Sequence, residues 1–327
     1  MKKTKDLKIV TIGGGTGNSV MLYGLKNYTK NITAIVTVAD DGGGSGILRE
    51  DLGMLPPGDI RACLIALSNS EKEMELLMKF RFDENSGRLA GQSFGNLFLA
   101  ALNGIYGDFH IGLKEASKVL AITGKVLPMT LENVTLYAEL EDGSVIEGES
   151  NITFLTRKSG GRIKRVYLEP ELSKPPFESI EDINRADIII LGPGSLYTSI
   201  MPNLLVDDLR DAVINSTAKK VYISNIMTQA GETDGFSVYD HLKAIITHCG
   251  ENFIDYIFVN NAEIPPEIEL KYKFKDSSNP IYIQDEELKK IENLGTKVIT
   301  GNFIDIKHNY VRHNAEEVSR MIFQTVR

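Results

Sequence analysis

Two glycine-rich turns carry the clearest chemical signal in this sequence. The first, residues 13–17, follows an apolar run, and the second, residues 42–46, follows another apolar run that ends in two aspartates. A glycine has no Cβ, so a ligand can approach its backbone, and the free amides at the start of the next helix favour an anion. We therefore predict a phosphate site in which a Cβ at Gly15 would fill the ligand's space. The residues expected to form it are Gly14, Gly15, Thr16, Gly17, Gly43 and Ser45.

Three aspartates lie next to these turns. Asp40 and Asp41 end the second apolar run, where the second strand of a nucleotide-binding βαβ unit presents an acid to a ribose hydroxyl. Two adjacent carboxylates can also hold Mg²⁺, so both interpretations stay open. Asp59 follows a Pro-Pro-Gly turn and precedes an apolar helical pattern, where it is either a ligand residue or simply the N-cap of that helix.

The first glycine turn matches neither of two common nucleotide motifs. A dinucleotide fingerprint reads G-x-G-x-x-G, and here Asn18 stands at the third glycine. A phosphate-binding loop of the NTPase type ends in Lys followed by Ser or Thr, and that pair is absent from the turn. These departures argue against NAD binding and against ordinary ATP hydrolysis.

Polar residues follow other apolar runs along the chain. Asn96 belongs to a glycine-spaced loop that leads into an apolar helix, Gly194 and Ser195 follow the strand predicted at residues 187–191, and Asn225 ends the next strand. Ligands of open parallel sheets bind outside the carboxyl ends of the strands. We therefore expect Gly194 and Ser195 to face the same crevice as residues 13–17, and Asn225 to contact a base or a sugar. Asn96 either contacts an anion or a sugar hydroxyl or is simply the N-cap of its helix.

Two residues near the end of the chain are candidates for holding a nucleotide. Tyr272 lies among Lys271, Lys273 and Lys275, and Arg312 precedes the closing helix predicted at residues 315–325. Tyr272 can stack on a base and Arg312 can hold a diphosphate, and each can equally be a surface residue.

The cysteines and two of the histidines give no sign of a disulfide or a zinc site. Cys63 and Cys249 are each isolated in a helical pattern, without a second cysteine nearby. His241 and His248 lie seven residues apart on one helix, with no third ligand close in sequence. We interpret both histidines as core or surface residues.

The elements that must position these residues alternate between strands and helices. This order predicts an α/β fold with a doubly wound, mostly parallel, Rossmann-like sheet. Between about residues 132 and 168 the apolar residues recur at every second position instead of with helical spacing, and two such strands flank Asp142-Gly143. This pattern predicts an antiparallel β-hairpin insert. Residues 157–165 are rich in Arg and Lys around two glycines and are expected to form a solvated loop. We expect residues 1–327 to form a single large domain.

Charge and hydropathy limit the location and the partners. The net charge of -8 argues against a general nucleic-acid binder, so a phosphate site must be made locally. No run of about 18 apolar residues occurs, so we expect no membrane insertion and a cytoplasmic location.

Several motifs together resemble the YvcK branch of the CofD-like family, whose members are called gluconeogenesis factors. The resemblance spans nearly the whole chain and implies a cytoplasmic protein that binds UDP-sugars such as UDP-N-acetylglucosamine and is needed for normal cell shape on gluconeogenic carbon sources. It also implies Asp41 and Asp59 as metal-side acids, residues 14–17 as the phosphate cradle, and Tyr272 and Arg312 as nucleotide-sugar contacts. The motifs are residues 12–17, 36–43, 56–61, 95–97, 192–199, 225–229 and 312–314.

Two functions are compatible with this resemblance. The first is a regulatory protein that binds a nucleotide sugar and acts through a protein partner in envelope synthesis, either alone or as a homo-oligomer. The second is a transferase, because related CofD enzymes use metal to transfer 2-phospho-lactate from a nucleotide-activated donor to a deazaflavin precursor. Mg²⁺ is the one cofactor under consideration, and only for the transferase. Gln92 stands where relatives often carry His, which weakens the case for a proton shuttle and leaves binding untouched.

Overall fold

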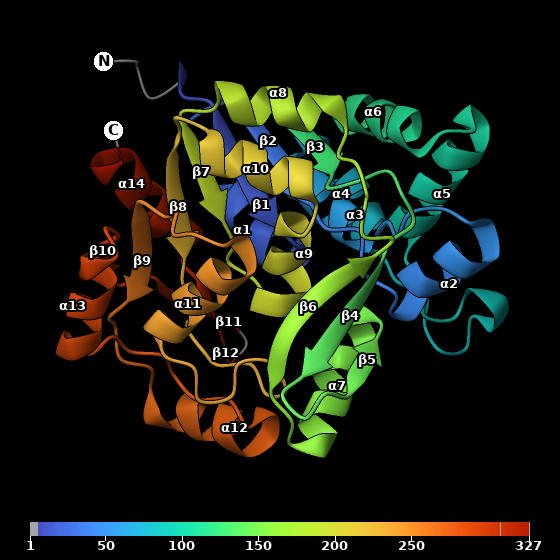
Figure 1. Ribbon diagram of the computed structural model, residues 1–327. Helices are drawn as coiled ribbons and strands as arrows, with labels where there is room; N and C mark the ends of the chain where they lie inside the picture. The colour runs from blue at the N-terminus through green and yellow to red at the C-terminus, as the bar shows by residue number, and fades with distance from the viewer. Residues whose placement is uncertain (1–5, 308, 327) are drawn as a thin grey trace.

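The computed structural model describes residues 6–307 and 309–326, and its centre is a parallel sheet of seven strands (Figure 1). The strand order is β10-β9-β8-β7-β1-β2-β3, and each neighbouring pair is parallel. The strands are β1 (Ile9–Gly13), β2 (Ile32–Val36), β3 (Lys125–Pro128), β7 (Ile188–Leu191), β8 (Lys219–Ile223), β9 (Tyr256–Asn260) and β10 (Lys297–Gly301). The predicted doubly wound, mostly parallel sheet is confirmed.

The central strands are apolar on both faces because helices cover both faces of the sheet. Every residue of β1, β2 and β7 is buried, as expected for parallel strands packed between two helical layers. Helix α1 packs between α3 and α14 on one face, and α8, α9, α10 and α11 pack together on the other. The N-terminal helices are α1 (Gly15–Leu25), α2 (Gly43–Leu52), α3 (Gly58–Leu67), α4 (Lys72–Lys79), α5 (Phe94–Tyr106) and α6 (Phe109–Val119). The later ones are α8 (Phe177–Arg185), α9 (Met201–Leu204), α10 (Asp207–Asn215), α11 (Val238–Cys249), α12 (Pro266–Asp276), α13 (Asp285–Asn293) and α14 (Ala315–Thr325).

The strand order reverses between β1 and β7. From β1 the chain builds outwards through β2 and β3, whereas β7, β8, β9 and β10 extend from the other side of β1. The loops that follow β1 and β7 therefore lead away from each other and leave a crevice at the carboxyl ends of these strands. This topological switch point is where the fold favours a ligand.

The predicted antiparallel insert is confirmed, and it contains a helix that was not predicted. Strands β4 (Thr135–Leu140), β5 (Val145–Glu147) and β6 (Ile163–Glu169) form a sheet in the order β5-β4-β6, and α7 (Glu149–Ser159) connects β5 to β6. In Figure 1 the insert lies beyond the carboxyl ends of the central strands. The solvated loop predicted at residues 157–165 is wrong at both ends, because Arg157 and Lys158 form the last turn of α7 and residues 163–165 begin β6. Gly160 ends this helix in the left-handed conformation that favours glycine.

A second small hairpin near the end of the chain carries Arg312. It consists of β11 (Ile304–Lys307) and β12 (Tyr310–His313), and it precedes α14. The predicted helix at residues 315–325 is confirmed with the same bounds. Within the described residues, no helix is both long enough and apolar enough to cross a membrane.

Candidate functional site

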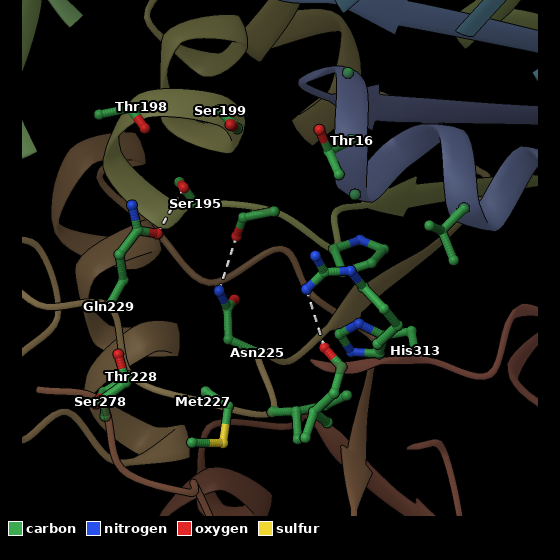
Figure 2. A pocket seen from close by; sticks show the side chains of 18 of the residues that line it. Thr16, Ser195, Thr198, Ser199, Asn225, Met227, Thr228, Gln229, Ser278 and His313 are labelled. Carbon is green, nitrogen blue, oxygen red and sulfur yellow. Dashed lines mark hydrogen bonds between the residues drawn. The ribbon is translucent and has the colours of Figure 1, made fainter. Parts of the chain in front are cut away.

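A cavity of about 520 Å³ opens at the switch point (Figure 2). Ligand pockets in proteins have volumes of about 300–1,000 Å³, so the cavity has the size of a small-molecule site. Its walls come from the turns after β1, β2, β7 and β8, from α3, and from the insert and the C-terminal hairpin. The lining residues are Gly15, Thr16, Gly17, Val20, Thr37, Asp40, Asp59, Glu149, Pro193, Gly194, Ser195, Thr198, Ser199, Asn225, Ile226, Met227, Thr228, Gln229, Tyr272, Ser278, Val311, Arg312 and His313.

The glycines of the first turn let three elements meet at the start of α1. A Cβ on Gly15 would lie 2.3 Å from Asp59 Oδ1, and a Cβ on Gly17 would lie 2.0 Å from the Pro193 carbonyl oxygen. Helix α1 therefore begins in direct contact with α3 and with the turn after β7. The idea that a Cβ at Gly15 would fill ligand space is wrong, because it would first collide with Asp59. The N-terminus of α1 still faces the cavity, where its amides favour an anion.

Asp59 is a half-buried residue at this junction, and its carboxylate does not cap α3. The N-cap of α3 is Pro57, and the backbone N–H of Gly15 donates a hydrogen bond to the Asp59 carboxylate. The predicted N-cap role is therefore wrong, because the carboxylate turns towards α1 instead of its own helix. Burial raises the pKa of Asp59 to about 6, although the Gly15 amide opposes this shift.

Three further carboxylates gather near Asp59. Asp40 accepts a hydrogen bond from the Gly42 N–H at 2.9 Å, and burial raises its pKa. Burial raises the pKa of Glu149 to about 8, and the charges of Asp40, Glu232 and Asp59 add to this shift. Burial also raises the pKa of Glu232, which lies behind the cavity wall, to about 7. We call the cavity end formed by Asp40, Asp59 and Glu149 the acidic end.

Polar contacts along the cavity wall fix its middle part. The Asn225 side-chain amide donates to the Gly194 carbonyl at 2.9 Å, and the Ser195 hydroxyl donates to Gln229 Oε1 at 2.6 Å (Figure 2). The Gln229 amide in turn donates to Glu232 Oε1. These bonds tie the turn after β7 to the turn after β8, so the cavity wall on this side of the switch point is held together.

The opposite end of the cavity is aromatic and cationic. The Val311 N–H donates to the Tyr272 hydroxyl at 3.0 Å, which fixes the ring of α12 against β12. The Arg312 guanidinium lies 5.4 Å from the Tyr310 ring centroid, and it donates to the Val311 carbonyl. Burial lowers the pKa of His313 to about 4, so this histidine is neutral at physiological pH. We call the end formed by Tyr272, Arg312 and Val311 the aromatic end.

The cavity brings together most of the residues predicted from the sequence. Gly15, Thr16, Gly17, Asp40, Asp59, Gly194, Ser195, Asn225, Tyr272 and Arg312 all line it. Gly14, Asp41, Gly43, Ser45 and Asn96 do not line it.

These five residues support the cavity from outside. Gly14 is the N-cap of α1, and Gly43 opens α2 with a φ of 49°. Ser45 donates a hydrogen bond to Asp40, and Asn96 accepts one from Arg61 at 3.0 Å. Asp41 Oδ1 accepts a hydrogen bond from the Ser150 N–H at 2.9 Å, so it contacts the insert, and a metal role for Asp41 stays a prediction.

Sequence reasoning missed the two glutamates. Glu149 opens a helix that was not recognised, and Glu232 lies in a loop that was treated only as polar. Glu232 could have been found from its place in the loop that follows β8, because ligands of parallel sheets bind at the carboxyl ends of the strands. The two histidines of α11 are confirmed as packing residues, because His241 and His248 both contact backbone carbonyls within that helix.

The acidic end fits a hard divalent cation only with help from a ligand. Mg²⁺ is commonly bound by one or two carboxylates together with phosphate oxygens and water. Asp40 and Asp59 provide such a pair beside the N-terminus of α1. In residues 6–307 and 309–326, no group of three or more His, Cys, Asp or Glu residues could hold a metal ion. These two aspartates are therefore the residues that would hold Mg²⁺ on a bound diphosphate.

Comparison with known proteins identifies relatives along the whole chain. The family model described as 2-phospho-L-lactate transferase CofD matches residues 9–304. A protein of Bacillus subtilis (strain 168) named "Gluconeogenesis factor" is 50% identical over 315 residues, which cover 96% of this chain and 96% of that protein. A protein of the same name from Halalkalibacterium halodurans is 48% identical over 320 residues, with 98% and 97% covered.

A solved structure has the same fold. The crystal structure of a UPF0052 family member from Bacillus halodurans superimposes with a TM-score of 0.91 at 48% sequence identity. The match covers 97% of this chain and 99% of that one.

Proposed function

The chain belongs to the gluconeogenesis-factor branch of the CofD family, and from that premise we propose that it is a regulatory protein that binds a nucleotide sugar of the UDP-N-acetylglucosamine type. We further propose that it works in the cytoplasm through a protein partner in envelope synthesis, and so supports cell shape on gluconeogenic carbon sources. The first of these proposals is the one that the geometry of the cavity supports.

The observation that carries the proposal is the difference between the two ends of the cavity. Tyr272 and Arg312 at the aromatic end suit a base, which stacks on aromatic rings, and the nearby phosphates. The N-terminus of α1, whose Gly15 amide contacts Asp59, suits a diphosphate. Asp40, Asp59 and Glu149 at the acidic end suit a group that donates hydrogen bonds, such as a sugar with several hydroxyls. A nucleotide sugar presents these three groups in this order.

The acidic end also argues against ligands that carry phosphate at both ends. A terminal phosphate there would face like charges in a partly buried site, which disfavours its charged form. Burial raises the pKa of Glu149 to about 8, so this group is mostly protonated at neutral pH and adds little repulsion to the nearby diphosphate. A neutral glycosyl group avoids the repulsion altogether.

A second candidate function is that of a metal-dependent transferase. It is favoured by the position of Asp40 and Asp59 beside the phosphate cradle. Bound Mg²⁺ would neutralise the charge of the diphosphate. The contribution of the chain itself is to hold the two carboxylates in place through the Gly42 and Gly15 amides. An acceptor molecule must also reach the ligand, and the open cavity permits this.

Calorimetry of UDP-N-acetylglucosamine binding tests the binding proposal. We expect saturable binding by the wild-type protein and weaker binding by Tyr272→Leu, which keeps apolar packing and removes the aromatic face. A wild-type protein that binds neither UDP nor UDP-N-acetylglucosamine would contradict the proposal.

Turnover separates the regulator from the transferase. The protein is incubated with UDP-N-acetylglucosamine, Mg²⁺ and cell extract as the source of an acceptor, and the nucleotide sugar is then quantified. We expect the ligand to be recovered intact. Mg²⁺-dependent consumption that disappears in Asp59→Asn would establish the transferase instead.

A further inference from the structure

Helix α7 of the insert brings a carboxylate into the cavity that the central sheet does not provide. Glu149 is the first residue of this helix, and it lines the acidic end together with Asp40 and Asp59. A hydrogen bond joins the Glu149 carboxyl group to the hydroxyl of Thr198, from the segment after β7. The insert therefore completes the acidic end and is part of the site.

Asp41 holds the start of α7 in place. Its Oδ1 accepts a hydrogen bond from the Ser150 N–H at 2.9 Å, directly after Glu149. Its Oδ2 lies against the backbone of Gly148, where an added Cβ would be 2.3 Å away. Gly148 has a φ of 90°, a conformation that side chains other than glycine rarely adopt. The carboxylate after β2 thus fixes the residue on each side of Glu149.

The next turn of α7 is fixed to the cavity wall as well. The Thr153 hydroxyl donates to Glu232 Oε1 at 2.7 Å, and a Cβ on Gly231 would lie 2.4 Å from the Thr153 carbonyl oxygen. Residues four apart on a helix lie on the same face, so Glu149 and Thr153 both face the cavity wall. Two separate contacts, one at Asp41 and one at Glu232, therefore set the direction of Glu149.

We propose that Glu149 selects the glycosyl group of the nucleotide sugar through a hydrogen bond between its carboxyl group and a ring hydroxyl, and that Asp41 is its positioning residue. This inference rests on the proposed function, because it assigns the sugar to the acidic end. A ring hydroxyl donates to a carboxyl oxygen, whereas a sugar carboxylate would face the carboxylates of Asp40 and Asp59. Selectivity of this kind comes from a repulsive element as much as from an attractive one.

The test compares UDP, UDP-glucose and UDP-glucuronate, which share the nucleotide, while the two sugars differ only in the carboxylate. Calorimetry should show that the wild-type protein binds UDP-glucose at least about tenfold more tightly than UDP-glucuronate. In Glu149→Leu, which removes both oxygens of the carboxyl group, UDP-glucose binding should weaken by about tenfold. Glu149→Gln keeps an accepting oxygen, so it is the matched control and should bind UDP-glucose like the wild type. Binding of UDP alone should stay within about twofold.

The positioning role of Asp41 is tested by comparing UDP-glucose with UDP, and by comparing two substitutions of Asp41. Asp41→Ala should weaken UDP-glucose binding by about tenfold and leave UDP binding unchanged, because only the glycosyl contact depends on α7. Asp41→Asn should restore binding, because its Oδ1 still accepts the Ser150 N–H. Glu147→Ala, which removes an exposed carboxylate of β5 two residues before Glu149, is the matched control and should behave like the wild type.

The outcomes separate this inference from the proposed function. Failure of the wild-type protein to bind UDP in any form would overturn both. Normal UDP binding together with unchanged UDP-glucose binding in Glu149→Leu would overturn the role of Glu149 alone. An equal loss of UDP and UDP-glucose binding in Asp41→Ala would overturn the positioning role of Asp41.

Discussion

The substitution Glu232→Gln should make the stability of this protein less dependent on pH. Glu232 is buried behind the cavity, and its Oε1 accepts hydrogen bonds from Thr153, Thr198 and Gln229. Its Oε2 has no hydrogen-bond partner within the described part of the chain. Glutamine can keep the accepting oxygen in place while it removes the ionisable group.

The magnitude follows from the pKa of Glu232. Burial raises this pKa from 4.5 to about 7, so the folded chain binds the proton more tightly than the unfolded chain does. The free energy of unfolding contributed by Glu232 is therefore fully present below pH 4.5 and is lost as the pH rises towards 7. The difference of about 2.5 between the two pKa values corresponds to an upper limit of about 3 kcal/mol. The buried glutamine NH₂ group adds a cost of about 1–3 kcal/mol, which does not change with pH.

Urea unfolding at about pH 5 and about pH 8 measures this effect, because the two values bracket most of the titration. On going from the lower to the higher pH, Glu232→Gln should gain about 2–3 kcal/mol relative to the wild type. Glu147→Gln, which changes an exposed carboxylate, should show no such gain. Parallel pH profiles for the wild type and Glu232→Gln would refute the reasoning, because Glu232 would then titrate normally in the folded protein.

Three further predictions concern the site and its scaffold. Arg312→Ala should weaken UDP-N-acetylglucosamine binding by roughly ten- to hundredfold in calorimetry, because a charge-assisted contact is worth about 1.5–3 kcal/mol, and an unchanged affinity would remove Arg312 from the site. Gly17→Ala should lower the free energy of unfolding by about 1–3 kcal/mol, because its Cβ meets the Pro193 carbonyl, whereas Gly104→Ala, with open space around it, should not destabilise in the same urea titration. Ser237→Ala removes half of the capping box of α11 and should cost about 0.5–2 kcal/mol of stability without changing ligand affinity, so a change in affinity would contradict the separation of scaffold and site.

Much of the central sheet could be predicted from local patterns. The continuous apolar runs of β1, β2 and β7 are typical of strands covered on both faces, and the glycine turns after them mark where these strands end. Helix α14 was predicted with its observed bounds, residues 315–325, because its apolar residues recur with helical spacing. Long helices and strands whose apolar residues recur with one clear period are the elements that a single sequence predicts well.

Elements that depend on distant contacts could not be predicted. Helix α7 contains Thr153 and Thr156, which favour helices weakly, and its start is fixed by Asp41 from more than a hundred positions earlier. The hairpin of β11 and β12 is held by the hydrogen bond to Tyr272, which lies 39 positions before Val311. Tertiary contacts of this kind outweigh local propensity, and they are not visible in a single sequence.

The same distinction applies to the site. Residues in glycine turns and at strand ends, such as Thr16 and Ser195, could be assigned because the parallel sheet brings strand ends together. Glu149 reaches the cavity from the insert, so its role depended on how the insert folds back. Asp40 and Asp41 were treated as one pair, yet only Asp40 lines the cavity, because successive residues of an extended chain point in opposite directions.

Native mass spectrometry in the presence of competing nucleotides tests the central claim most directly. The wild-type protein is mixed with equal concentrations of UDP-N-acetylglucosamine, UDP-glucuronate, ATP and NAD, and the masses of the bound species are recorded. Our account predicts a predominant complex whose added mass is that of one intact UDP-N-acetylglucosamine, and it predicts the loss of that complex in Arg312→Ala. A predominant complex with ATP or NAD, or an equally strong complex in Arg312→Ala, would contradict it.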